Sequence, residues 1–123
     1  IKRSSLPPRL VNENENGIRI KVYIQGHMIG AGKMELFHLV AEKGSIRSAA
    51  KAMGMSTKRA TLLLKTIEEA FPNPILEKQP GNKGTLVTFF GKELLKKYLV
   101  LSDHLTKESE EFINWAASKQ SVK

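Results

Sequence analysis

The stretch "GSIRSAAKAMGMSTKRATLLLKTI", from Gly44 to Ile67, decides the fold of this chain. It is rich in helix-forming residues, and every charged side chain in it is basic, although the whole chain has 12 Asp and Glu among 123 residues. An Asp or Glu held against a phosphate would be repelled at short range. A helical segment without carboxylates is therefore a surface suited to a polyanion.

Two short helices with a break between them are the interpretation that this stretch favours. Ser45 can cap a helix over about Ile46–Met53, and Gly54 provides the break. Ser56 can cap a second helix that runs to Phe71, after which two prolines prevent continuation.

Small side chains on the first helix allow the two helices to cross closely. Ala49, Ala50 and Ala52 leave room for a steep crossing about a glycine-containing turn. This is the helix-turn-helix arrangement, in which the second helix enters the major groove of DNA.

The second helix has two different faces. One face follows the spacing of a buried stripe, formed by Ala60, Leu63, Leu64, Ile67 and Phe71. The opposite face offers hydroxyl groups, cations and methyl groups, which bind phosphates, base edges and thymine methyls. The DNA contacts that we expect from this helix are Ser56, Thr57, Lys58, Arg59, Thr61, Leu62 and Lys65.

Two neighbouring segments are expected to add phosphate contacts. The backbone amides after Ser45, helped by the helix dipole and by Arg47, can hold a phosphate. The pieces "ILEKQ" and "TLVT" on either side of "PGNKG" predict a hairpin in the position of a wing. Lys83 of this hairpin can touch phosphate or the minor groove, and an ordinary surface turn is the alternative.

The residues before Gly44 predict a tail, two strands and a helix. Residues 1–17 are polar and contain two prolines, which is typical of a flexible tail. Apolar and polar residues alternate over 18–24, which predicts a strand, and a short second strand follows over 27–29. After Gly32 the apolar period becomes helical up to Gly44.

A long helix is expected from Phe89 to about Ser118, with Thr88 as its cap. It would be about 42 Å long at 1.5 Å per residue, too long for so small a domain to cover, so it needs a partner. Its apolar residues recur at three- and four-residue spacing, as in a coiled coil. They predict a homodimer interface formed by Leu94, Tyr98, Leu101, Leu105, Phe112 and Trp115.

The fold class expected from these elements is mainly α with a small β content (α+β). It is a winged helix-turn-helix with an N-terminal β-hairpin and a long C-terminal dimerisation helix. The expected parts are a tail (1–17), the DNA-binding domain (18–88), the dimerisation helix (89–118) and a second tail (119–123).

Composition supports a nucleic-acid partner. The formal net charge is +8 and the pI is about 9.8, which favours polyanions such as DNA. The absence of cysteine excludes disulfides, thiolate catalysis and cysteine-ligated metal. No apolar run is long enough to span a bilayer and no signal-peptide pattern is present, so we expect a cytoplasmic protein without a membrane partner.

These segments resemble a known family. "GSIRSAAKAMGMSTKRA" is similar to the helix-turn-helix of the LysR-type regulators. With "VYIQGHMIGAGKMELFHLVAEKGS" before it and "LVTFFGKELL" after it, the resemblance narrows to the N-terminal DNA-binding domain of the ModE-type molybdate-responsive regulators, over about Ile18 to Tyr98. The resemblance implies a homodimeric winged helix whose two recognition helices meet adjacent major grooves.

The chain also differs from this family. Thr57 stands where an aromatic residue is common and Thr61 where a tryptophan is usual, whereas Lys58 keeps the family's cation. Direct readout depends on these side chains, so the family's operator sequence is not carried over. In the family, molybdate is bound by C-terminal domains, for which the short "KQSVK" end leaves no room. We therefore expect no molybdate binding and no cofactor in this chain.

Two other classes of function are compared with DNA binding, an enzyme and a protein-interaction module. An enzyme is disfavoured because His27, His38 and His104 are isolated and no metal-binding, nucleophile or phosphate-loop motif is present, so no catalytic or metal-ligating residue is assigned. A protein-interaction module is the alternative, in which the long helix recruits another protein. A steep loss of duplex affinity with rising salt would distinguish DNA binding from this alternative.

Overall fold

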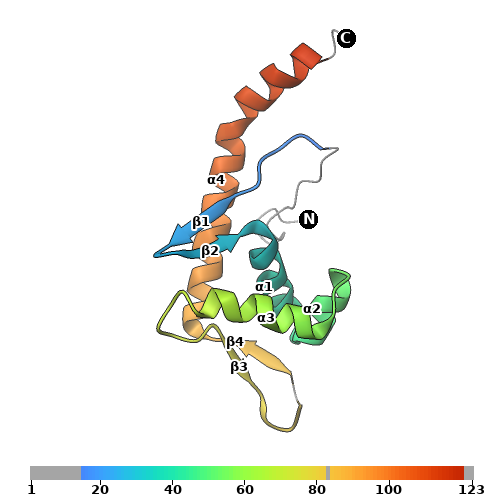
Figure 1. Cartoon of the computed structure of the whole chain (residues 1–123), viewed down its shortest axis with the longest axis vertical. Coiled ribbons are helices and arrows are strands. Elements are labelled where there is room, and N and C mark those ends of the chain that lie inside the picture. Colours follow the sequence, from blue (N-terminus) through green and yellow to red (C-terminus); the bar gives the residue numbers. More distant parts are fainter. Residues whose placement is uncertain (1–14, 83, 121–123) are drawn as a thin grey trace.

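The computed structural model describes residues 15–82 and 84–120, which form a winged helix-turn-helix with a long C-terminal helix (Figure 1). The expected α+β fold class is confirmed. Along the chain the elements are β1 (Lys21–Ile24), β2 (His27–Gly30), α1 (Ala31–Lys43), α2 (Ile46–Ala52), α3 (Thr57–Glu68), β3 (Leu76–Lys78), the 3-10 turn η2 (Pro80–Asn82), β4 (Thr85–Val87) and α4 (Phe89–Gln120).

The strands form two separate antiparallel hairpins. β1 pairs with β2 from Lys21 opposite Gly30 to Ile24 opposite His27. The strand was expected from residue 18 but begins at 21, and before it the carbonyl of Ile20 accepts a hydrogen bond from the Ala31 amide at 3.1 Å. The second hairpin pairs β3 with β4 and lies at the far end of the domain from β1 and β2 (Figure 1).

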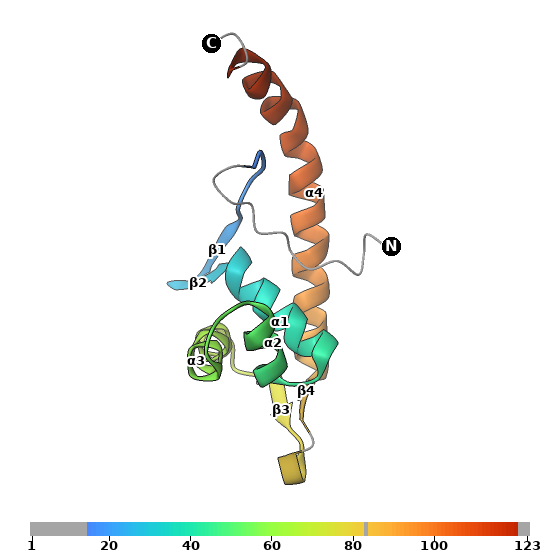
Figure 2. The same cartoon turned by 90° about the vertical axis from the view of Figure 1, so that its right-hand side faces the viewer.

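Helix α1 is the centre of the core. This helix contacts α2, α3, α4 and both hairpins. Because of these contacts, no surface is exposed on Met34, Leu36, Phe37 and Val40. Figure 2 shows α3 on the opposite side of α1 from α4. The remaining buried apolar residues come from β2, α1, α2, α3, α4 and the loop before β3: Ile29, Ala31, Ala49, Ala50, Ala60, Leu64, Ile67, Ile75, Leu95 and Tyr98.

The third helix is shorter than its sequence indicated. It was expected to reach Phe71 but ends at Glu68. The Glu68 carboxylate accepts hydrogen bonds from the backbone amides of Ile75 and Leu76 at 3.0 and 3.3 Å, which holds the chain as it turns back toward β3. Phe71 then packs edge-on against Phe90, with 5.3 Å between ring centroids.

The last helix begins where the sequence indicated and continues to Gln120 rather than to about residue 118. Thr88 caps it, because its hydroxyl oxygen accepts from the Gly91 amide at 3.0 Å. The C-terminal end of α4 projects beyond the other helices (Figure 1). We call residues 99–120 of α4 the arm.

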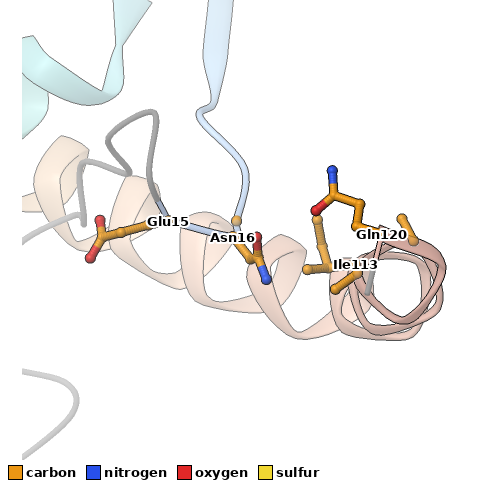
Figure 3. A pocket seen from close by; sticks show the side chains of 7 residues that line it. Glu15, Asn16, Ile113 and Gln120 are labelled. Atoms are coloured by element: carbon orange, nitrogen blue, oxygen red, sulfur yellow. The ribbon is translucent and has the colours of Figure 1, made fainter. Parts of the chain in front are cut away.

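The expected N-terminal tail is described only from Glu15. Residues 15–17 line a pocket together with Ile113, Ala116, Ala117 and Gln120 of α4 (Figure 3). This part of the expected tail therefore lies beside the arm, and residues 1–14 lie outside the described residues.

Candidate nucleic-acid interface

Two serine caps and a backbone hydrogen bond at the turn hold the helix-turn-helix in place. The Ser45 hydroxyl oxygen accepts from the Ser48 amide at 3.0 Å, and that of Ser56 accepts from the Arg59 amide at 3.1 Å. Between the helices, the Met55 amide donates to the carbonyl of Ala50 at 3.0 Å. The caps and the break therefore stand at the positions that the sequence indicated.

The two buried residues of α2 are alanines, and the buried stripe of α3 begins with a third alanine. Ala49 and Ala60 have no exposed surface and Ala50 is 1% exposed. Larger side chains here would separate the helices, since packed interiors leave no spare volume. The packing of these alanines sets the angle between α2 and α3.

The outward face of α3 collects the residues assigned to DNA contact. Its buried stripe is Ala60, Leu64 and Ile67. The assigned residues are all exposed, and they are Ser56, Thr57, Lys58, Arg59, Thr61, Leu62 and Lys65. Arg47 of α2 is exposed as well, and Ser45 is half-buried as the cap of that helix.

Among residues 15–82 and 84–120, no carboxylate is seen to pair with the cations of this face. The close contacts between basic and acidic side chains lie elsewhere, at His38–Glu42 and Lys107–Asp103. Glu68, the nearest acid along α3, has its carboxylate bonded to the backbone of the next loop. The positive charges are thus free to meet phosphates.

The wing is attached to the corner between α1 and α2. The Thr85 amide of β4 donates to the carbonyl of Gly44 at 2.9 Å. A β-carbon at Gly84 would lie 2.6 Å from the same oxygen, so only glycine allows this approach. This link was not predicted, because two glycines 40 positions apart give no sequence signal of contact. Lys83, one of the expected phosphate contacts, lies outside the described residues.

The long helix contains the six residues assigned to the dimer interface, but they do not form one free surface. Tyr98 is 6% exposed and belongs to the core of its own chain, and Leu94 packs against that core. On the arm, Leu101, Phe112 and Trp115 are 40%, 66% and 59% exposed, and Leu105 is half-buried. The rings of Phe112 and Trp115 lie 6.1 Å apart between centroids.

Titratable groups with shifted pKa values lie away from the α3 face. Burial raises the pKa of Glu35 on α1, and the nearby His38 opposes this shift. Burial also raises the pKa of Tyr98. Within the described part of the chain, no three His, Asp or Glu side chains are arranged to hold a metal ion. None of the described helices has the length and apolar character needed to cross a membrane.

The comparisons with known proteins agree with this geometry. Residues 32–92, from α1 to the start of α4, match the family described as bacterial regulatory helix-turn-helix protein, lysR family. This part of the chain is a LysR-type helix-turn-helix domain. The chain is also 30% identical over 82 residues to the molybdenum-pterin-binding protein MopA of Rhodobacter capsulatus. That match covers 64% of this chain and 31% of MopA, so the chain spans less than a third of this relative.

Both matches confirm the resemblance to LysR-type and ModE-type regulators. A LysR-type helix-turn-helix is a DNA-binding, transcription-regulatory domain, and its two helices here are α2 and α3. The family match supports DNA binding by this domain.

Proposed function

We propose that this chain is a sequence-specific, double-stranded-DNA-binding transcriptional regulator that acts as a homodimer in the cytoplasm. The observation that supports it best is the outward face of α3, on which every charged side chain is a cation without a carboxylate partner among the described residues. Phosphate contacts supply most of the affinity of such a face and base contacts supply its specificity.

In this proposal each exposed residue has one kind of contact. Arg59 and Lys58, near the start of α3, reach a base edge or phosphates, and Lys65 and Arg47 reach phosphates. Thr57, Thr61 and Leu62 adjust the sequence preference. The wing touches the backbone or the minor groove beside α3.

Self-association is proposed through the arm. Phe112 and Trp115 are large aromatic side chains left more than half exposed on a helix that extends past its domain. Aromatic residues of this kind dominate the energy of protein interfaces. A pair of arms would place two copies of α3 on one duplex, which is how dimeric helix-turn-helix proteins read near-palindromic sites. Residues 18–88 would then be the DNA-binding part and residues 89–118 the dimerisation part.

The double variant Lys58→Ala, Arg59→Ala tests the assignment of α3. We expect it to fold and self-associate like the parent and to lose about 2–4 kcal/mol of affinity for a duplex selected from a random pool, because each charged or base contact contributes roughly 1–3 kcal/mol. Affinity is measured by fluorescence anisotropy at two salt concentrations.

The matched control is Lys96→Ala, Lys97→Ala, which removes the same charge from exposed positions on α4. It is expected to lower affinity much less, since it changes only the long-range field. If the α3 variant and its control lost the same affinity, charge alone would explain binding and the recognition-helix assignment would fall.

A further inference from the structure

One large apolar side chain on the candidate interface is left in solvent. Leu62 is 56% exposed, and it is the only exposed large hydrophobic residue of α1, α2 and α3, all of which the structure describes. On a helix it shares a face with Lys58 and Lys65, four residues before it and three after it. More than half of this apolar side chain therefore lies in solvent between two cations.

The hydroxyl beside it is already used as a donor. Thr61 Oγ1 donates to the carbonyl of Thr57, one turn earlier, at 2.9 Å. A hydroxyl has one hydrogen to donate and two lone pairs that accept. With this bond in place, Thr61 offers outward a methyl group and an acceptor, and no donor.

The chemistry of the two side chains selects one type of base pair. In the major groove an A·T pair displays the 5-methyl group of thymine and the amino donor of adenine. A G·C pair displays two guanine acceptors and the amino donor of cytosine, so an acceptor on the protein does not distinguish the two pairs, but a G·C pair lacks the methyl group. We infer that Thr61 and Leu62 read thymine methyl groups, so that the bound sequence has A·T pairs opposite the middle of α3. This inference rests on the proposed function and names the base chemistry that the same face recognises.

The test on the DNA removes only the methyl group. A duplex is first selected from a random pool with the full chain, and thymine is then replaced by deoxyuridine, which keeps the hydrogen-bonding groups of the pair. Burial of one methyl-sized group contributes about 0.8 kcal/mol, so each contacted thymine should lower affinity about fourfold when it is replaced. Replacement outside the α3 footprint should have no effect.

The test on the protein uses matched pairs of variants. Leu62→Ala should bind more weakly and should no longer distinguish thymine from deoxyuridine at the position it reads. The control Leu86→Ala truncates a leucine of nearly equal exposure, 55%, on β4, and it should keep the full sensitivity to deoxyuridine. Thr61→Val keeps the methyl group and should keep the sensitivity to deoxyuridine at the position that Thr61 reads, whereas Thr61→Ser keeps the hydroxyl and should lose this sensitivity.

The outcomes separate this inference from the function on which it rests. If the chain binds no duplex better than random DNA, the proposed function fails, and this inference fails with it. If the chain binds its selected duplex specifically and deoxyuridine leaves the affinity unchanged, the function stands and the methyl readout is wrong. If Thr61→Ser keeps this sensitivity to deoxyuridine and Thr61→Val loses it, Thr61 acts through its hydroxyl and its assignment to methyl readout is overturned.

Discussion

Residues 89–98 of α4 and the arm belong to one unbroken helix, but the protein stabilises them in different ways. In residues 89–98, Gly91, Leu95 and Tyr98 are buried against the domain. In the arm, which the structure describes throughout, no residue is buried, and Phe112 and Trp115 are mostly exposed. Apolar residues recur at similar spacing in residues 89–98 and in the arm. Spacing therefore identifies an apolar face but does not identify what covers it.

The largest effect is expected from removing the aromatic residues of the arm. The double variant Phe112→Ala, Trp115→Ala should weaken self-association by at least about 2 kcal/mol, or roughly 30-fold in dissociation constant, since buried aromatic residues dominate interfaces. Sedimentation equilibrium measures it.

Val100→Ala is the control for the arm. Val100 is 63% exposed but lies about 100° around the helix from Leu101, off the predicted interface. Its variant should associate like the parent. Equal association of parent and double variant would show that the arm face does not mediate the dimer.

A smaller effect is expected from Gly91, where α4 crosses the core. A β-carbon there would lie 2.5 Å from the carbonyl oxygen of Ile75 and 2.8 Å from Val87 Cγ1. Gly91→Ala should therefore lower the free energy of unfolding by about 1–3 kcal/mol, as overpacked cores do. Urea denaturation at fixed chain concentration measures this change.

Gly32→Ala makes the same substitution in α1, where a β-carbon would meet no atom within 4 Å. It should raise stability by about 0.5–1 kcal/mol, because alanine favours a helix more than glycine does. Loss of stability in this control would mean that the glycine comparison does not report on packing.

The substitution Tyr98→Phe should change the free energy of unfolding less than Gly91→Ala does, and in the opposite direction. Its hydroxyl is buried and has no hydrogen-bond partner among the described residues. Because an unsatisfied buried polar group is unfavourable, Tyr98→Phe should leave stability unchanged or raise it by up to about 1 kcal/mol. Thermal unfolding measures it. A clear loss of stability would show that the hydroxyl has a partner when the protein self-associates.

The smallest effect on stability is expected from replacing Glu35 on α1. Burial raises its folded-state pKa above 4.5. The folded state then holds this proton more tightly than the unfolded state, so the contribution of Glu35 to stability is complete below pH 4.5 and is lost as pH rises through the folded-state pKa. Glu35→Gln should remove this part of the pH dependence and be more stable than the parent at pH 7. Denaturation at pH 4 and pH 7 tests this, and an unchanged pH profile would contradict it.

Much of this protein could be derived from the sequence alone. Serine caps, glycine breaks and apolar period act within a few residues, so the helix-turn-helix, the wing hairpin and the start of α4 were predicted at their observed places. The outward face of α3 followed for the same reason, because the side chains on a helix face are set by the periodicity of 3.6 residues.

Contacts between distant parts of the chain were decided only by the tertiary structure. The end of α3 depends on bonds from Glu68 to a later loop, and the wing position depends on Gly44 and Gly84. Tyr98 has the same coiled-coil spacing as Trp115, but one is in the core and the other is in solvent. Local sequence determines which face of a helix is apolar, whereas burial depends on which surface reaches that face in three dimensions.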